Sequence, residues 1–236
     1  MCTNPRILLK LSGQIFINQE TGLPDIALVA SIASQIKLLS EQYHFGIVIG
    51  GGNFFRGNQH GKAYGLSSWS AHTTGMLATV MNGVMLRDIM VQSGLDCTLV
   101  SALDCPQIAQ PINQYVITEA ANKNSCIIFA GGTGNPYFTT DTNAVLRALQ
   151  FGAKEIWKGT SIDGVYDQDP RTHKDAQRLQ HISYMYALEH HIAIMDATAF
   201  ALASEQSLAI RIFNIFEANA LVRAVQDKTF GSSIQQ

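Results

Sequence analysis

The sequence contains little charge and no long hydrophobic run. Only 14% of its 236 residues are charged, and 16 lysines and arginines oppose 18 aspartates and glutamates, giving a formal net charge of −2. Such a composition provides no basic surface for nucleic acid or for an anionic membrane. No window approaches the roughly 18 uninterrupted apolar residues of a membrane span, and the first residues lack an apolar signal-peptide core. We therefore expect a cytoplasmic protein.

Cysteine and histidine show none of the spacings that are typical of metal sites. Four cysteines are present, far apart and without a CxxC pair: Cys2, Cys97, Cys105 and Cys126. This pattern favours reduced, buried thiols. Seven histidines form no HExxH or similar motif. Because His190 and His191 are adjacent, they cannot share one helical face, which favours a pair exposed to solvent.

Two common nucleotide-binding motifs, the Walker sequence and the GxGxxG fingerprint, are also absent. The chain instead has GGTGNPYFTTD at residues 131–141, directly after an apolar run at residues 126–130. Three glycines in four positions allow positive φ and a close approach of a ligand to the backbone. A buried strand, a glycine-rich turn and a helix N-terminus in this order make an anion site. A plain glycine-rich connection with a capping threonine is the alternative.

A second glycine-rich loop follows another short apolar strand. Residues 45–49 lead into Gly50, Gly51 and Gly52, and Arg56 follows shortly after. Two such loops from two strands of one parallel sheet converge at its carboxyl edge. Arginine suits a bidentate contact with phosphate or carboxylate. Lys10 ends a further apolar strand, where a buried lysine needs a partner, although an exposed lysine on an edge strand is the alternative.

Strand and helix patterns alternate along the whole chain, without an internal linker or repeat. This order predicts one α/β domain over residues 1–236, a three-layer α/β/α sandwich with a mostly parallel central sheet. We expect an acceptor half of about residues 1–150 and a donor half of about residues 151–236. Helices are predicted over 25–39 with Asp25 as N-cap, over 74–94, from 142, over 181–193, after Asp196 and over 219–225, before a polar tail. Residues 58–73 are predicted to form a flap, an interface segment or a solvent loop.

Together these side chains are of the types that catalyse phosphoryl transfer. That reaction needs charge neutralisation and alignment more than covalent chemistry. Lys10 can bridge phosphates, the two glycine loops can hold oxygens, and Asp141 and Asp196 at helix starts can orient the lysine or hold Mg²⁺.

The sequence resembles bacterial uridylate kinases (UMP kinases), which have the amino acid kinase fold. Seven motifs in the family's order carry the resemblance over nearly the whole chain. They are LLKLSG at 8–13, VIGGGNFFRG at 48–57, GMLATVMNG at 75–83, GTGNPYFTTDT at 132–142, DGVYDQDP at 163–170, MDATAF at 195–200 and IRIFN at 210–214.

The resemblance implies transfer of phosphate from ATP to UMP, giving ADP and UDP in pyrimidine biosynthesis, by a cytoplasmic homohexamer. It implies that Mg²⁺ is held mainly by nucleotide phosphates rather than by protein ligands. The implied catalytic residues are Lys10, Arg56, Asp141 and Asp196. The implied ATP-binding residues are Lys10, Leu11, Ser12, Gly13, Gly52, Arg56, Thr160, Tyr166 and Asp169. The implied UMP-binding residues are Gly51, His72, Thr133, Gly134, Asn135, Pro136, Tyr137, Phe138, Thr139 and Thr140.

The chain departs from the family's pattern at several positions. His72 stands where the family usually has an aspartate that holds the ribose, Gln14 replaces a glutamate, and Ser161 replaces a lysine. An imidazole cannot grip two ribose hydroxyls as a carboxylate does. Two alternatives therefore stay open: the same fold acting on another nucleoside monophosphate, and a non-catalytic nucleotide- or oxyanion-binding protein.

Overall fold

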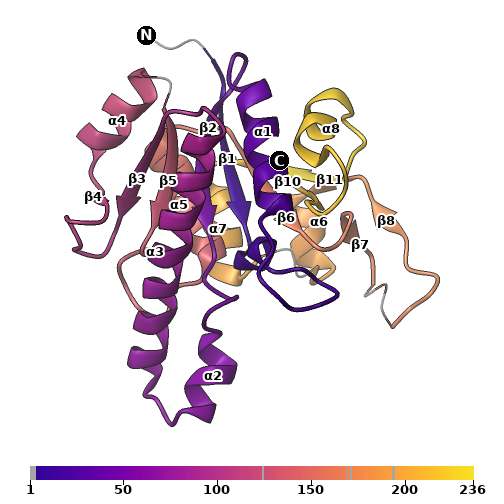
Figure 1. Ribbon diagram of the computed structural model, residues 1–236. Helices are drawn as coiled ribbons and strands as arrows, with labels where there is room; N and C mark the ends of the chain where they lie inside the picture. Colours follow the sequence, from indigo (N-terminus) through magenta and orange to yellow (C-terminus); the bar gives the residue numbers. More distant parts are fainter. Residues whose placement is uncertain (1–3, 124, 169, 171, 193–194) are drawn as a thin grey trace.

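A long, mostly parallel β-sheet runs through the centre of the computed structural model (Figure 1). The structure describes residues 4–123, 125–168, 170, 172–192 and 195–236. Within these ranges the sheet has nine strands in the order β4-β3-β5-β2-β1-β6-β10-β11-β9. Their bounds are β1 Arg6–Leu11, β2 His44–Ile49, β3 Cys97–Ser101, β4 Gln110–Pro111, β5 Cys126–Ala130, β6 Glu155–Thr160, β9 His181–Ser183, β10 Ala209–Asn214 and β11 Ser232–Gln235. Every pairing in the sheet is parallel except that of β10 with β11.

Helices cover both faces of the sheet, so the predicted three-layer α/β/α architecture is confirmed (Figure 1). One face packs against α1 Ala27–Leu39, α3 Ser68–Gln92 and α8 Ala220–Gln226. The other packs against α4 Gln114–Asn122, α5 Thr140–Phe151, α6 Tyr184–Glu189 and α7 Ala197–Glu205. Outside the layers lie the short helix α2 Gly57–Ala63, a 3-10 turn at Gly13–Phe16, and the hairpin of β7 Val165–Tyr166 with β8 Arg178–Leu179.

Side chains of the central strand β1 alternate between the two faces of the sheet. Ile7, Leu9 and Leu11 join the core under α1 and α3, whereas Leu8 joins the core under α5. Successive side chains of a strand point to opposite faces, so Lys10 lies on the α5 side with Leu8. The only charged side chain of the strand interior is thus directed to the N-terminal end of α5.

Capping residues fix both ends of α5. Thr139 Oγ1 accepts hydrogen bonds from the backbone N–H groups of Asp141 and Thr142, at 3.0 and 3.2 Å. Gly152 ends the helix with φ of 74°, a left-handed conformation that glycine adopts without a steric penalty. The cap at Thr139 fixes where the first turn of α5 begins, and with it the position of Asp141.

Five sequence predictions about the elements are wrong, three of them in the N-terminal part. The long helix begins at Ser68 rather than at 74, because the Ser67 side chain accepts from the N–H of Ser70 and caps it. Residues 57–63 form α2 instead of a loop. Asp25 accepts from the N–H of Ala27 but lies one residue before the N-cap position.

The other two errors lie in the C-terminal part. Residues 181–183 form strand β9 before the helix α6, where one helix was predicted, and residue 193 falls outside the described residues. The polar tail contains β11, which pairs antiparallel with β10 and parallel with β9. Its alternating Ser232, Ser233 and Ile234 have a weak apolar signal, and pairing between two neighbours defines the strand.

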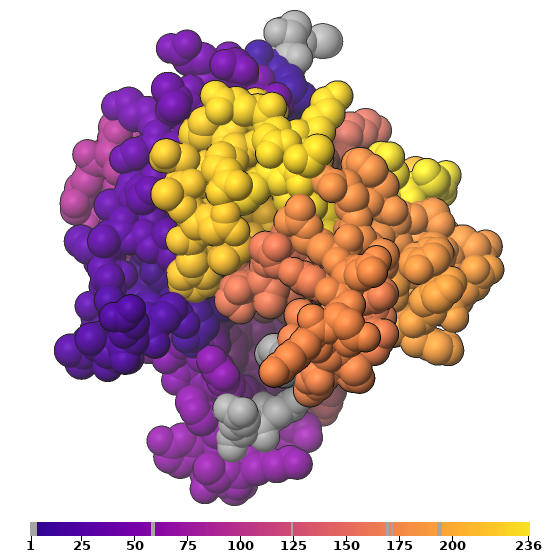
Figure 2. All heavy atoms as spheres, turned by 90° about the vertical axis from the view of Figure 1, so that its right-hand side faces the viewer, coloured from indigo at the N-terminus to yellow at the C-terminus, as the bar shows by residue number. Residues whose placement is uncertain are grey.

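Segments from the N-terminal and the C-terminal parts of the chain lie side by side on one face of the molecule (Figure 2). Figure 2 shows the C-terminal segments, in orange and yellow, directly against the N-terminal segments, in indigo and purple. The pairing of β1 with both β2 and β6 joins them within one sheet. In the described part of the chain, no helix combines the length and apolar character needed to cross a bilayer.

Shortening a core side chain beneath α5 should destabilise the protein strongly. Phe151 is fully buried and packs edge-on against Phe129 at 6.3 Å between ring centroids. We expect Phe151→Ala to lower the free energy of unfolding by about 3–5 kcal/mol, through lost burial and the cavity left behind. Leu38→Ala, at a site 65% exposed, is the matched control and should change it by under about 0.5 kcal/mol. Urea unfolding measures both, and equal small changes would contradict the packing described.

Candidate active site

Two lysines and one aspartate form a charged cluster at the carboxyl edge of the sheet. Lys10 and Lys158 are register partners on the adjacent strands β1 and β6. Asp141, in the first turn of α5, reaches both: its Oδ1 lies 3.0 Å from Lys10 Nζ and its Oδ2 lies 2.7 Å from Lys158 Nζ. The three side chains are 12–16% exposed. The Lys10–Asp141–Lys158 cluster is thus mostly buried but open at one side.

The cluster carries a net positive charge, because two ammonium groups share one carboxylate. Burial alone would raise the pKa of Asp141, but the charges of Lys10 and Lys158 and their hydrogen bonds hold it below its ordinary value of 3.8. Burial and the neighbouring Lys10 lower the pKa of Lys158, against the opposing effect of Asp141. Asp141 therefore stays ionised at neutral pH, and the unbalanced charge favours an anion.

Asp196 lies beside the cluster, and its negative charge opposes the lowering of the Lys158 pKa by burial. It is the N-cap of α7, as predicted, and accepts from the N–H groups of Thr198 and Ala199. Its carboxylate also accepts from the hydroxyls of Thr139 and Thr142 on α5. Its carboxylate oxygens are thereby engaged in joining α7 to α5 beside the cluster.

Buried carboxamides hold the first glycine loop against the end of β1. Asn82, fully buried on α3, donates to the carbonyl of Gly50 at 2.6 Å and exchanges hydrogen bonds with Asn53. A Cβ atom at Gly13 would lie 2.1 Å from Asn53 Oδ1 and 2.7 Å from the Gly50 carbonyl oxygen. Glycine at position 13 is therefore required by the close approach of two loops.

A pocket of about 440 Å³, here called the glycine-loop pocket, opens beside the cluster between α3 and the start of α5. Arg56 stands at its edge and donates from Nε to the carbonyl of Gly52 at 3.2 Å. The pocket is lined by Ile49, Gly51, Gly52, Phe55, Arg56, Gly57, Ala71, His72, Gly75, Met76, Thr79, Gly132, Phe138, Thr139, Thr140 and Asn143. It joins both glycine-rich loops that the sequence singled out.

The second glycine-rich loop depends on a buried arginine that sequence reasoning did not single out as a site residue. Gly131 and Gly132 have φ of 75° and 61°, which favours glycine. Arg147, 3% exposed, donates to the carbonyl of Gly132 at 2.9 Å and to Gln150 at 2.6 Å. Burial lowers the pKa of Arg147 to about 10, so it remains charged at neutral pH. Its charge lies directly behind the loop.

His72 meets the same loop through an aromatic contact. Its ring lies 5.0 Å from that of Tyr137, with the planes tilted by 56°. Tyr137 has φ of 73°, a left-handed conformation that is unusual for a tyrosine, and it is 63% exposed. Helix α3 and the loop are therefore in contact at the border of the glycine-loop pocket.

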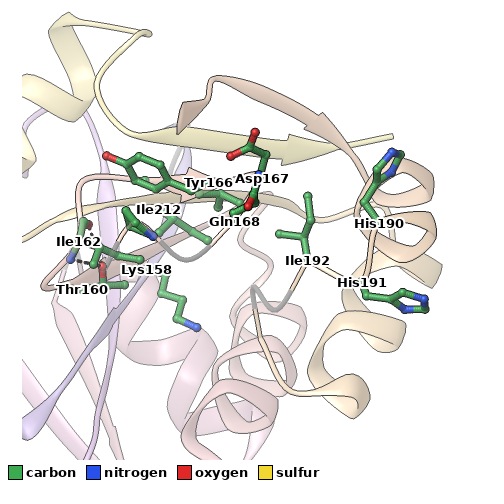
Figure 3. Close-up of a pocket in the computed structure, with 13 residues that line it drawn as sticks. Lys158, Thr160, Ile162, Tyr166, Asp167, Gln168, His190, His191, Ile192 and Ile212 are labelled. Carbon is green, nitrogen blue, oxygen red and sulfur yellow. Dashed lines mark hydrogen bonds between the residues drawn. The ribbon is translucent and has the colours of Figure 1, made fainter. Parts of the chain in front are cut away.

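A second pocket, of about 470 Å³ and here called the β6 pocket, lies on the other side of the cluster. Figure 3 shows Lys158, Thr160 and Ile162 on one side, His190, His191 and Ile192 on the other, and Tyr166, Asp167 and Gln168 above them. Tyr166 donates its hydroxyl proton to Asp163 at 2.8 Å, which orients the ring. His190 and His191, predicted to be a solvated pair, are exposed but also border this pocket.

The structure divides the predicted site residues into groups. Thr160 and Tyr166 line the β6 pocket, while Gly51, Gly52, Arg56, His72, Phe138, Thr139 and Thr140 line the glycine-loop pocket. Ser12 and Gly13 lie next to Lys10 at the end of β1, and Leu11 is fully buried, so only its backbone can meet a ligand. Thr133, Gly134, Asn135, Pro136 and Tyr137 belong to the second loop without lining either pocket. Asp169 lies outside the described residues.

Three buried polar residues of the site were missed as site residues: Lys158, Arg147 and Asn143. Lys158 had a detectable signal, because KEIWK places a lysine at the carboxyl end of an apolar strand, as LLKLSG does for Lys10. Arg147 and Asn143 lie in an ordinary helical pattern. Nothing in the local sequence distinguishes them from exposed polar residues.

A mostly parallel sheet with two pockets beside a lysine–aspartate cluster belongs to the class of α/β proteins that bind ligands at the carboxyl edge of the sheet, and the charge of the cluster favours an anionic ligand. Comparison with known families agrees with this, since the model of the amino acid kinase family matches residues 5–214. The chain belongs to the amino acid kinase family.

Solved structures narrow the similarity further. The UMP kinase from Ureaplasma parvum is 33% identical, with a TM-score of 0.95, and the match covers 100% of both chains. The UMP kinase from Bacillus anthracis is 28% identical, with a TM-score of 0.92 over 98% of this chain and 97% of that one. The uridylate kinase from Archaeoglobus fulgidus, at 20% identity, a TM-score of 0.73 and coverage of 97% and 99%, shares the fold.

Neutralising Asp141 should cost stability in a pH-dependent way. In Asp141→Asn the two ammonium groups lose their shared carboxylate, and we expect the free energy of unfolding to fall by about 2–4 kcal/mol at pH 7. Because the folded pKa of Asp141 is lowered, its contribution is complete above its ordinary value of 3.8 and is lost as pH falls through the folded value.

Urea unfolding of both proteins between pH 7 and pH 3 measures this effect. The difference between wild type and variant should shrink below about pH 4. A difference that stays constant down to pH 3 would contradict the role given to the ionised carboxylate. Asp88→Asn, at an exposed position near the C-terminal end of α3, is the control and should change the free energy of unfolding at pH 7 by under about 0.5 kcal/mol.

Proposed function

We propose that this protein transfers the γ-phosphoryl group of ATP to UMP, giving ADP and UDP. The observation that carries the proposal is the position of the Lys10–Asp141–Lys158 cluster between two pockets of nucleotide size. The full-length similarity to UMP kinases supports the same reaction. A protein that only binds nucleotides is not favoured, because the cluster has the charge and the open side that transfer needs.

In this proposal the donor nucleoside occupies the β6 pocket and the acceptor occupies the glycine-loop pocket. Thr160, Tyr166 and the predicted Asp169 then contact ATP. Lys158 lines the β6 pocket and also bonds Asp141, while Thr140 of the glycine-loop pocket directly precedes Asp141. The phosphates of the two nucleotides therefore meet over the cluster.

The chain's own residues contribute electrostatics and alignment to the reaction. Lys10 stabilises negative charge on the transferring phosphoryl group, and Arg56 and the N–H groups of the glycine loops hold the flanking oxygens. Asp141 acts by keeping two lysines at fixed distances rather than by taking a proton. Because the cluster exists before substrate binds, little reorganisation is needed when charge develops.

Magnesium fits this site as a companion of ATP. The oxygens of Asp141 are bonded to two lysines and those of Asp196 to two threonines and two backbone N–H groups. No group of three or more His, Cys, Asp or Glu side chains suited to a metal occurs in the described residues. We propose that the ATP phosphates carry Mg²⁺, which would neutralise charge on the phosphates.

The hexameric assembly, the cytoplasmic location, the role in pyrimidine biosynthesis and the division into acceptor and donor halves remain predictions. They rest on the resemblance described above. The location of Thr160 and Tyr166 after residue 151, and of the glycine-loop pocket before it, is consistent with the proposed halves.

Removal of Lys10 should abolish most turnover. We expect Lys10→Ala to lower kcat for ATP and UMP by about 10²–10³-fold, the usual cost of one donor aimed at developing charge. Lys123→Ala, at an exposed lysine of the α4 end, should leave kcat unchanged. ADP release with Mg-ATP and, separately, UMP, CMP, dUMP, AMP and GMP measures both the loss and the acceptor. Wild type that is silent with all five acceptors would refute the proposed function.

His72 is the reason to consider a second acceptor, another nucleoside monophosphate. An imidazole offers the ribose fewer hydrogen-bond acceptors than a carboxylate does. Restoring the carboxylate should tighten UMP binding. We expect His72→Asp to lower KM for UMP by about 3–10-fold, the worth of one further neutral or charge-assisted hydrogen bond. KM for ATP is the internal control and should not move. A raised KM for UMP would show that the imidazole itself, or its contact with Tyr137, is suited to the acceptor.

A further inference from the structure

Asn143 combines deep burial, an unsatisfied polar atom and a place in the wall of the glycine-loop pocket. It lies one turn into α5 and is 2% exposed. Its Oδ1 is buried and has no hydrogen-bond partner among the described residues. Such an atom costs free energy in the folded protein unless something binds it. The Asn143 side chain also lines the glycine-loop pocket.

Two neighbouring hydroxyls in the pocket wall, those of Thr79 and Thr139, already have partners. Thr79 donates its hydroxyl proton to the Met76 carbonyl at 2.7 Å and accepts from the N–H of Gly131 at 2.8 Å. Thr139 donates to Asp196 and accepts from two N–H groups of α5. Unlike these two hydroxyls, the buried Oδ1 of Asn143 is left with spare hydrogen-bonding capacity.

The carboxamide can present either of its ends to the pocket. Rotation about the terminal torsion of asparagine meets a broad, shallow energy profile. The rotation exchanges Oδ1 with the Nδ2 group, so the side chain can accept from an N–H or O–H group or donate to an oxygen. It needs no movement of the α5 backbone, which Thr139 caps.

We infer that Asn143 hydrogen-bonds the acceptor nucleotide directly and contributes to its selection. The inference rests on the proposed function for the identity of the acceptor, and it adds a contact that the resemblance does not imply. A site that pairs a buried polar group with one substrate group rejects analogues that lack this group. Asn143 is thus a specificity residue of the glycine-loop pocket.

Calorimetric titration with UMP, alongside steady-state kinetics, tests the inference in Asn143→Leu, which keeps the approximate volume and removes both polar ends. We expect Kd and KM for UMP to rise by about 3–12-fold, with kcat and KM for ATP unchanged. Asn122→Leu, at the exposed end of α4, is the matched control. A Kd for UMP equal to that of wild type would overturn the inference.

The thermal midpoint without ligand separates a binding role from a structural one. Because Oδ1 has no partner in the ligand-free protein, its replacement by an apolar group of similar shape should leave Tm unchanged or raise it. A Tm lowered in Asn143→Leu, with normal UMP affinity, would assign the residue to folding instead. Asn143→Ser leaves space and a small hydroxyl, and unchanged affinity in either folded variant counts against the inference.

Acceptor analogues identify the contacted group. The analogue that lacks this group should bind wild type and Asn143→Leu equally, so 2′-deoxy-UMP and 3′-deoxy-UMP report on the ribose and N3-methyl-UMP reports on the base. If Asn143→Leu raises the Kd of all three analogues as it raises that of UMP, the contact is with a carbonyl or phosphate oxygen that accepts from Nδ2.

The same titrations keep the two proposals apart. Wild type that binds UMP without turnover contradicts the proposed kinase activity, and the Asn143 contact is then judged by Kd alone. Turnover by wild type with equal Kd in the variant contradicts the Asn143 contact alone. Wild type that does not bind UMP contradicts both.

Discussion

The repulsion between two ammonium groups on neighbouring strands is the constraint on which this site depends. Lys10 and Lys158 are paired in register and point to the same face of the sheet. Because both side chains are mostly buried, their like charges need an intervening carboxylate. Asp141 meets this need only if the first turn of α5 lies over the ends of both strands. The charge balance of the site therefore requires α5 to be placed where it is.

Three consecutive side chains at the start of α5 face three different parts of the site. Successive residues of a helix point about 100° apart, so Asp141 faces the lysines, Thr142 faces Asp196 on α7, and Asn143 faces the glycine-loop pocket. The cap at Thr139 sets the phase of all three. A shift of the helix by one residue would disrupt the charged cluster, the link to α7 and the pocket wall together.

Sequence reasoning succeeded where the signal is local and apolar. The strands at residues 45–49 and 126–130 and the helix after Asp196 were found because a buried parallel strand is a short apolar run and a cap is one residue before a helical pattern. It failed where the signal is weak. The start of α3 lies in a Ser/Gly-rich segment, and β11 is defined by its partners on both sides.

The candidate site divides in the same way. The sequence by itself determined the α/β layers and the two glycine loops and singled out Lys10 and Asp141, because glycine spacing and a lysine within an apolar strand are visible without coordinates. Only the tertiary structure showed that Lys158 shares Asp141 and that Asp196 accepts hydrogen bonds from two threonines. It also showed that Arg147 lies behind the second glycine loop and that Asn143 lines the pocket. These facts depend on strand register and helix rotation, which join residues far apart in the chain and leave no local pattern.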